Sequence, residues 1–302
     1  MSSLAQLGTC PPGPIDPCRG SIPPSGPVID DRTGTRAIDG WPAPGRLPSR
    51  PRLHRRPPPT HTHDAHRRTP THTDERHTKS DKRVLLALTS YDDLGGVRKT
   101  GYYVGEAAHP WKEFIDAGFD VDVASVAGGT PPQDGYDESD EVQRAFLTDE
   151  KISAQLADTT RLDDIDPTAY DAVVLVGGHG TMWDFPDSVP LAAIGREIYE
   201  SGGVVAAVCH GPSGLVNMKL SDGSPLIAGK TVAGFTNEEE AAVGLTDTVP
   251  FLLADRLTAV GATHVAAAPW SEHVEVDGRL VTGQNPQSAG AVGREVVALL
   301  KD

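Results

Sequence analysis

Short apolar runs alternate with amphipathic segments from Arg83 to the end of the chain, and this alternation limits the fold more than any other feature. The runs RVLLALTS, DVDVASV, YDAVVLVGG and VVAAV have the length and β-branched content of strands buried on both faces. Segments with helical spacing, GEAAHPWKEFIDAG and PLAAIGREIYESGG among them, lie between these runs. Strands that alternate with helices form parallel sheets with right-handed crossovers. The sequence therefore predicts an α/β domain at residues 83–302, a parallel sheet sandwiched between helices.

The last third of the chain extends this pattern. GKTVAGFT is typical of a strand, and residues 238–262 are predicted to form a helical segment with a break near Pro250. HVEVDGRLVTG predicts two extended arms around the turn at Asp277 and Gly278. The final residues, SAGAVGREVVALLKD, have the spacing of an amphipathic helix.

Residues 1–82 differ in composition from the rest of the chain. They are rich in Pro, Arg, His and Thr and have no apolar periodicity, so they are predicted to be a disordered tail. The abrupt change at KRVLLALTS raises a second hypothesis, that the working protein begins near His77.

Charge and cysteine content exclude several classes of function. The formal net charge of −15 argues against a nucleic-acid-binding surface and against binding to anionic membranes. The three cysteines, Cys10, Cys18 and Cys209, are too few for a disulfide framework, which favours a reducing, cytoplasmic location. No apolar run reaches the roughly 18 residues that a membrane-spanning helix needs.

The strand VVAAV leads into Cys209 and His210, and the stretch AVCHG has the form of a nucleophile elbow. Small residues, Ala207 and Gly211, leave room for a sharp turn that holds the cysteine in a strained conformation with its sulfur exposed above the sheet. The N-terminus of a following helix would favour a thiolate, and the His210 N–H would be one oxyanion donor. The alternative is an inert buried cysteine.

The stretch GGHGTMWDFP follows another predicted strand, so it reaches the same edge of the sheet. Glycines there let backbone N–H groups approach a ligand, and Gly178 is the expected second oxyanion donor. His179 is expected to be structural or to line the pocket.

Two further acidic features are candidates for proton transfer. Glu106 lies near the start of the first predicted helix, where a buried and protonated carboxyl aimed at Cys209 would act as a general acid or base. A carboxylate that orients His210 would complete a Cys–His–Glu set. Sequence spacing leaves three candidates for it, Glu238, Glu239 and Glu240.

Several motifs together resemble the ThiJ/PfpI superfamily: GEAAHPW, YDAVVLVGGHGTMWDFPD, VVAAVCHGP, GKTVAGFTNEEE, APW and DGRLVTGQNPQSA. More narrowly, they resemble its glyoxalase III (D-lactate dehydratase) branch, which includes stress-inducible holding chaperones. The resemblance covers residues 83–302 and implies a flavodoxin-like sandwich that commonly dimerises. By motif it places the nucleophile at Cys209, its neighbour at His210, the helix-start acid at Glu106 and the orienting acid at Glu240.

The resemblance implies a cofactor-independent, glutathione-independent glyoxalase that detoxifies methylglyoxal-type 2-oxoaldehydes to 2-hydroxy acids. Some larger relatives carry a metal site, but the sequence offers no convincing set of metal ligands, so no metal is expected. Two alternatives remain open. One is a stress-responsive holding chaperone or redox sensor, which suits an oxidisable thiolate. The other is a cysteine amidase or peptidase that uses the same Cys–His–Glu set.

Overall fold

The computed structural model describes residues 80–302. Seven strands form its main sheet: β1 (Arg83–Leu88), β3 (Asp120–Ser125), β5 (Thr160–Arg161), β6 (Ala172–Leu175), β7 (Val204–Val208), β10 (Val274–Asp277) and β11 (Leu280–Gly283). Their order in the sheet is β10-β11-β7-β6-β1-β3-β5. Every neighbouring pair is parallel except β10 and β11, which form an antiparallel hairpin.

The remaining elements are helices and two small ladders. The α-helices are α1 (Val104–Asp116), α2 (Glu141–Thr148), α3 (Glu150–Ala157), α4 (Thr181–Asp184), α5 (Val189–Glu200), α6 (Asn237–Ala242), α7 (Leu253–Ala259) and α8 (Ala289–Lys301). The 3₁₀ helices are η1 (Leu162–Asp164), η2 (Pro167–Ala169), η3 (Gly211–Leu215) and η4 (Pro286–Ser288). The ladders pair β2 (Tyr102–Tyr103) with β4 (Gln133–Asp134), and β8 (Thr231–Val232) with β9 (Thr263–His264).

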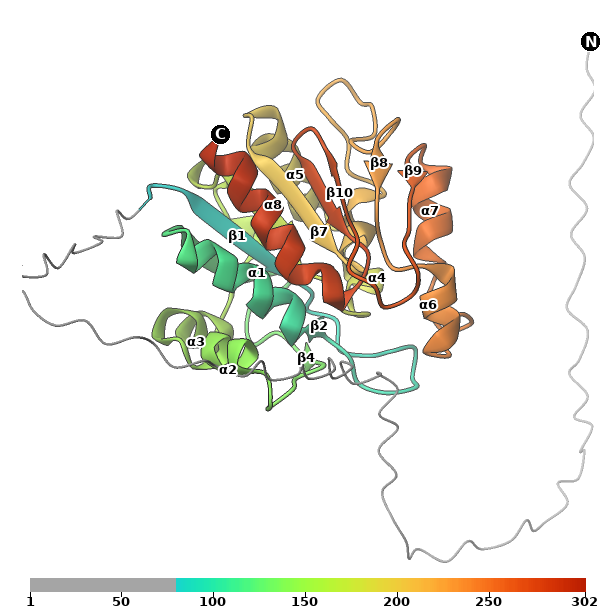
Figure 1. Cartoon of the computed structure of the whole chain (residues 1–302), viewed down its shortest axis with the longest axis horizontal. Coiled ribbons are helices and arrows are strands. Elements are labelled where there is room, and N and C mark those ends of the chain that lie inside the picture. Colours follow the sequence, from blue (N-terminus) through green and yellow to red (C-terminus); the bar gives the residue numbers. More distant parts are fainter. Residues whose placement is uncertain (1–79) are drawn as a thin grey trace, which may run out of the picture. The chain divides into compact units, whose positions relative to one another are not determined.

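Helices cover the sheet in layers. Helices α1 and α8 lie against each other across the strands (Figure 1), and α8 packs on β7 and β11. Helix α5 packs on β6 and β7. The central strands β6 and β7 consist of apolar residues with no exposed surface, as expected for parallel strands covered on both faces. The predicted α/β sandwich is therefore confirmed.

The sheet order determines where the functional residues lie. Strands β7, β6 and β1 are neighbours and run parallel, so their carboxyl ends lie at one edge. The loops that leave this edge begin at Thr89, Val176 and Cys209. In open α/β sheets this edge is where ligands bind.

Two expectations for the secondary structure need correction. The segment predicted as one helix with a break near Pro250 is two short helices, α6 and α7, and residues 243–252 between them are not helical. The predicted strand GKTVAGFT contributes only the two residues of β8. The hairpin around Asp277 and Gly278 and the C-terminal helix are confirmed.

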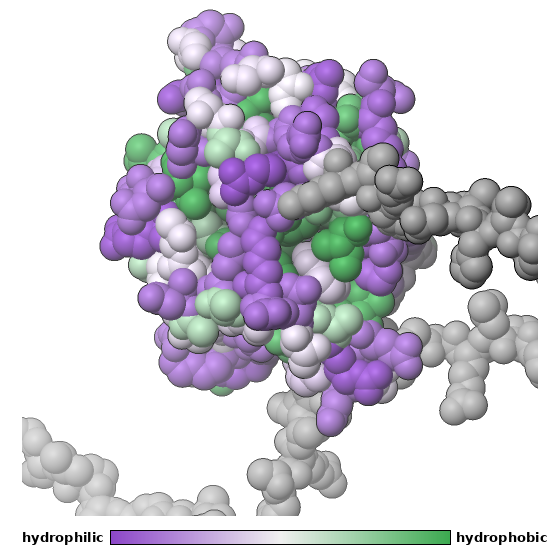
Figure 2. Space-filling model, turned by 90° about the vertical axis from the view of Figure 1, so that its left-hand side faces the viewer, coloured by the Kyte–Doolittle hydropathy of each residue, from purple (hydrophilic) through white to green (hydrophobic). Residues whose placement is uncertain are grey.

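The predicted disordered tail, residues 1–82, lies outside the described residues except for its last three positions. Within residues 80–302, no helix is both long and apolar enough to cross a membrane. Hydrophilic side chains cover most of the described surface on the side that Figure 2 shows.

Candidate active site

Cys209 is the residue that follows β7, and its backbone conformation is unusual. Its φ of 58° lies in the left-handed region, which residues with side chains rarely adopt. The turn is held on both sides: the Cys209 N–H donates to Gly283 O at 2.9 Å, and the Phe235 N–H donates to Cys209 O at 2.9 Å. A side chain at Gly211 would collide with Leu175 O, so this position needs a glycine. The predicted nucleophile elbow is therefore present, with the strain that such a turn stores.

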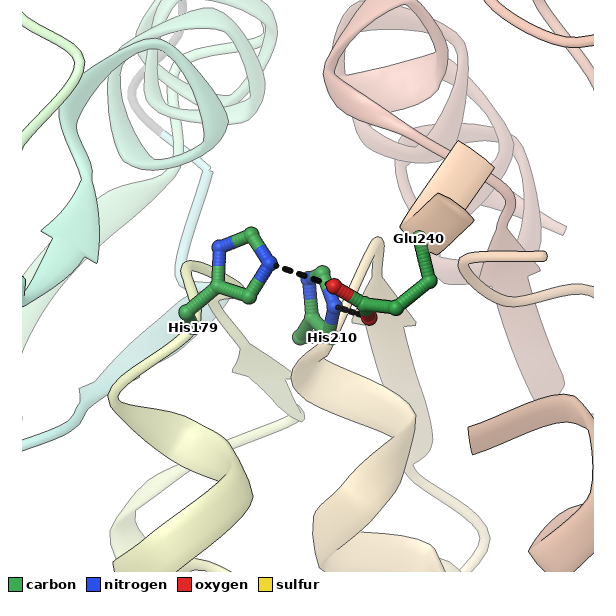
Figure 3. Close-up of side chains that lie close together, drawn as sticks. All are labelled: His179, His210 and Glu240. Atoms are coloured by element: carbon green, nitrogen blue, oxygen red, sulfur yellow. Dashed lines mark hydrogen bonds and ion pairs between the residues drawn. The ribbon is translucent and has the colours of Figure 1, made fainter. Parts of the chain in front are cut away.

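The cysteine leads into a line of hydrogen-bonded side chains. Cys209 Sγ lies 3.3 Å from His210 Nδ1, and His210 Nε2 lies 2.8 Å from Glu240 Oε2. The other carboxylate oxygen, Oε1, lies 3.0 Å from Nε2 of His179 (Figure 3). The structure thus brings together Cys209, His210 and Glu240 as predicted and adds His179, which the sequence analysis expected to be structural or to line the pocket.

The charges of this line follow from its surroundings. Burial acts to raise the pKa of Glu240, but the His210 and His179 rings outweigh it and hold that pKa well below its usual range. Burial and the neighbouring His210 lower the pKa of His179 to about 4. At neutral pH the carboxylate is therefore anionic and His179 is neutral, so each Nε2 carries a hydrogen and donates it to Glu240.

Glu106, in the first turn of α1, has no exposed surface. Burial raises its pKa well above the usual range, while the nearby Cys209 side chain and Gly177 backbone oppose the shift only in part. The carboxyl is therefore protonated at neutral pH and lies near the sulfur, and its two buried oxygens have no hydrogen-bond partner within residues 80–302. A side chain at Gly177 would collide with Glu106 Oε2, so this glycine makes room for the acid. The structure therefore places the predicted acid in a buried position near the nucleophile, and its part in proton transfer stays a prediction.

The state of the sulfur differs from the sequence prediction. Cys209 is only 2% exposed, so its sulfur is covered rather than exposed above the sheet. Burial raises the pKa of the thiol, and Glu106 raises it further when that carboxyl is ionised, whereas the His210 N–H lowers it. The helix that follows is the five-residue 3₁₀ helix η3, whose short dipole offsets little of this cost. The predicted resting thiolate is therefore corrected to a neutral thiol hydrogen-bonded to a base.

The two predicted oxyanion donors lie on loops that are joined to each other. The Thr181 hydroxyl lies 2.9 Å from Gly178 O and 3.0 Å from His210 O. Gly178 has a φ of 105°, and a side chain there would collide with Gly101 O. Only glycine fits this position without strain, and donation to an oxyanion by Gly178 and His210 stays a prediction.

The three consecutive glutamates have three different environments. Glu238 is exposed, Glu240 faces His210, and Glu239 is fully buried on another side of α6. The Glu239 carboxylate accepts five hydrogen bonds, from Thr236 N (3.0 Å), Thr236 Oγ1 (2.9 Å), Trp270 N (2.9 Å), Gln284 Nε2 (3.1 Å) and Asn285 Nδ2 (2.8 Å).

Glu239 therefore connects the start of α6 to the loops that contain the motifs APW and GQNPQS. One of its donors, Trp270, has a left-handed backbone with a φ of 62°. The Trp270 ring lies 5.8 Å from Phe235, and Phe235 lies 4.3 Å from the His210 ring. The sequence analysis assigned no role to Glu239, but the spacing Thr-x-x-Glu in TNEE is the signature of a capping box, which the structure contains.

One group in residues 80–302 has the composition of a metal site: the donor atoms of His179, His210 and Glu240 lie within 4.8 Å of one another. The two imidazole centroids are 4.0 Å apart. Two imidazoles on one tetrahedral zinc ion, with Zn–N bonds of about 2.0 Å, would have centroids roughly 5 Å apart. These atoms are already paired in short hydrogen bonds, so we interpret the group as a hydrogen-bonded set that orients His210.

Comparison with known proteins gives a consistent result. Residues 100–299 match the model of the DJ-1/PfpI family. Glutathione-independent glyoxalase HSP31 from Saccharomyces cerevisiae is 38% identical over 244 residues, which span 73% of this chain and 99% of that protein. Glyoxalase 3 from Candida albicans is 36% identical over 233 residues, which span 72% of this chain and 97% of that protein.

Solved structures show the same similarity. The crystal structure of glyoxalase III from Candida albicans matches with a TM-score of 0.68 and 36% identity, covering 72% of this chain and 97% of that one. The 24-kDa Rapid Encystment Protein of Francisella tularensis matches with a TM-score of 0.70 and 39% identity, covering 72% of this chain and 99% of that one.

Proposed function

The chain belongs to the DJ-1/PfpI family, and on that premise we propose that it is a glutathione-independent glyoxalase. The substrate is a 2-oxoaldehyde such as methylglyoxal, and the product is the 2-hydroxy acid, which for methylglyoxal is D-lactate. The relatives that share more than a third of their residues with this chain over nearly their whole length are named as such glyoxalases.

One observation carries the proposal: a thiol, a base and a buried acid meet at a single edge of the sheet. Cys209 Sγ lies 3.3 Å from His210 Nδ1, and the protonated Glu106 carboxyl faces the same sulfur. Conversion of a 2-oxoaldehyde to a 2-hydroxy acid needs a nucleophile and two groups that move protons. These three side chains supply both functions.

The first step is addition of the sulfur to the aldehyde carbon. The thiol proton passes to Nδ1 of His210 as the carbon–sulfur bond forms, and Glu240 stabilises the resulting imidazolium. His210 then transfers that proton to the aldehyde oxygen, which gives a neutral hemithioacetal. Backbone N–H groups of Gly178 and His210 stabilise the oxygen anion in between, each worth about 3 kcal/mol by analogy with other oxyanion holes.

The second step moves hydrogen from one carbon to the other. His210 removes the hydrogen from the former aldehyde carbon, while the Glu106 carboxyl gives its proton to the neighbouring ketone oxygen, which yields an enediol. His210 then protonates the second carbon, and the Glu106 carboxylate takes back a proton from the first hydroxyl. The product is a 2-hydroxyacyl thioester on Cys209, and both catalytic groups return to their starting protonation states.

The last step is hydrolysis of the thioester. Water adds to the thioester carbonyl with His210 as base, the carbon–sulfur bond breaks, and the sulfur takes the proton back from His210. Overall, one 2-oxoaldehyde and one water give one 2-hydroxy acid.

The test is lactate formation from methylglyoxal without glutathione, with the two lactate enantiomers measured separately. The native protein is expected to form D-lactate, and Cys209→Ala is expected to form none above the uncatalysed rate. Absence of product from the native protein, or equal product from the variant, would refute the proposal.

We also propose that the chain acts as a homodimer in the cytoplasm. The dimer is supported by the family resemblance, and the cytoplasmic location by the low cysteine content. Light scattering after size exclusion tests the first proposal, and localisation of the tagged full-length chain tests the second. A monomeric mass, or a tagged chain found outside the cytoplasm, would contradict them.

A further inference from the structure

His179 binds the free side of the carboxylate that orients the catalytic base. We propose that His179 is a positioning residue for the reaction: it fixes the Glu240 carboxylate so that one oxygen stays on His210 and the negative charge is shared between two imidazoles. This inference rests on the proposed function and adds a residue to its machinery.

The geometry of the three side chains supports this role. Glu240 offers one oxygen to each histidine, Oε2 to His210 at 2.8 Å and Oε1 to His179 at 3.0 Å (Figure 3). Each of the three side chains is at most 4% exposed, so water cannot replace a lost partner. The two imidazoles also contact each other, with ring centroids 4.0 Å apart and an interplanar angle of 40°.

The loop that carries His179 is rigidly attached to the nucleophile turn. Thr181 makes hydrogen bonds that link this loop to the His210 carbonyl, and the Ser213 hydroxyl donates back to Thr181 O at 3.1 Å. Thr181 and Ser213 have no exposed surface. Because these bonds use backbone atoms and other side chains, the loop does not depend on the His179 ring for its conformation.

One hydrogen bond is not enough to fix a glutamate. The side chain has three rotatable bonds, and their freedom is worth up to about 2 kcal/mol in long polar side chains. A carboxylate bound only through Oε2 could rotate about that contact and lengthen it. The second bond, from a rigid loop on the opposite side, fixes the plane of the Glu240 carboxylate. His179 thus acts on His210 through Glu240 and needs no contact with substrate.

The second bond also divides the carboxylate charge. The titratable groups that face Glu240 are His179 and His210, and His179 is faced in addition by the more distant cation of Arg98. Without the His179 donor, the whole charge of Glu240 acts on His210, and the His210–Glu240 pair holds its proton more tightly. Such a pair releases the proton at higher pH and transfers it less readily to carbon.

Three variants test the inference. His179→Leu removes the donor at similar volume, and His179→Gln restores an N–H near the position of Nε2. His264→Asn is the control, because His264 is a half-buried histidine whose ring makes one hydrogen bond, to Gly234 O at 3.2 Å, and does not contact Glu240.

The Leu variant is expected to lose about tenfold to a hundredfold in kcat, the usual effect of a lost orienting partner, with KM within about twofold. The acid limb of its pH–rate profile moves to higher pH. The Gln variant recovers most of the native kcat and a nearly native pH–rate profile, and the His264→Asn control keeps the native kcat and pH–rate profile. A Leu variant with native kcat and native pH profile, or a Gln variant as impaired as Leu, would overturn the inference.

A second readout separates this inference from the proposed function. The rate of Cys209 alkylation by iodoacetamide depends on His210 and Glu240 but not on glyoxalase turnover, with Cys209→Ala as the blank for Cys10 and Cys18. Its pH profile is expected to move with His179→Leu and to return with His179→Gln. If the native protein is inactive as a glyoxalase but the alkylation profile shifts in His179→Leu, the proposed function is refuted and the role of His179 stands. If the native protein is active but the alkylation profile does not shift in His179→Leu, the proposed function stands and the role of His179 is refuted.

Discussion

The three glutamates at the start of α6 allow one sharp experiment, because a single conservative change at each should affect a different property. We expect Glu239→Gln to destabilise the fold, Glu240→Gln to remove activity, and Glu238→Gln to change neither. Glu238 is exposed and serves as the matched control.

The expected cost at Glu239 follows from its five hydrogen bonds. An amide has one acceptor oxygen, so if that oxygen keeps Trp270, Gln284 and Asn285, the amide nitrogen faces the Thr236 N–H. One buried donor then loses its partner, which costs about 1–3 kcal/mol, and three bonds weaken from charged to neutral strength. Relief of a buried charge offsets part of this loss, and the net destabilisation is about 3 kcal/mol.

Thermal and urea unfolding of the three variants measure this cost. For a domain of this size, 3 kcal/mol corresponds to a fall in Tm of about 6–12 °C. Glu238→Gln should stay within about 0.5 kcal/mol of the native protein. Glu240→Gln should lose at least a hundredfold in kcat/KM, because an amide cannot accept from both histidines. Equal stability of the Glu238 and Glu239 variants would refute the structural role of Glu239, and an active Glu240→Gln would refute the orienting role of Glu240.

Three further predictions follow from the site and its surroundings. Gly177→Ala places a methyl group against Glu106 Oε2, so it should lower the unfolding free energy by about 1–3 kcal/mol and kcat by at least tenfold. The control Gly290→Ala meets only ordinary contacts, so it should lower neither stability nor kcat. Equal stability and equal kcat of the two variants would contradict the packing of Glu106 on Gly177. Glu106→Gln mimics the protonated acid in shape but cannot exchange a proton, so kcat should fall by about 10²–10⁴-fold with stability nearly unchanged; native kcat would exclude Glu106 from proton transfer. Burial raises the pKa of Asp184 from 3.8 to about 6, so the folded state binds this proton more tightly and stability should fall as pH rises from about 4 to about 6. Urea unfolding measured across that range should show a weaker dependence of the unfolding free energy on pH for Asp184→Asn. The same pH dependence in the native protein and the variant would contradict the raised pKa of Asp184.

The fold and the nucleophile could be predicted because their signals are local. The apolar runs of β1, β6 and β7 and the small residues around Cys209 each constrain the chain within a few positions. Helices α2 and α3 were not predicted, because their polar sequences bury few apolar side chains. The break near Pro250 was predicted, but its extent over residues 243–252 was not, since the apolar content of these residues resembles that of a helix.

The finer details of the site depend on contacts between distant segments. Glu239 and Glu240 are adjacent in the sequence, and only the direction of α6, fixed by the Thr236 cap, determines which of them faces His210. His179 and Glu240 are 61 residues apart, and no spacing rule relates them. The covered sulfur of Cys209 likewise depends on loops from other strands, so the sequence motif alone predicted it to be exposed.

The most direct test of the account is to look for the covalent intermediate on Cys209. Native protein mixed with isotopically labelled methylglyoxal, quenched in acid within the first turnover and digested, should carry a three-carbon acyl label on the peptide that contains Cys209. Hydroxylamine should release this label, as expected for a thioester, and its decay should match the appearance of D-lactate. Turnover to D-lactate with no label on Cys209, or label that remains after turnover ends, would contradict the thiol mechanism.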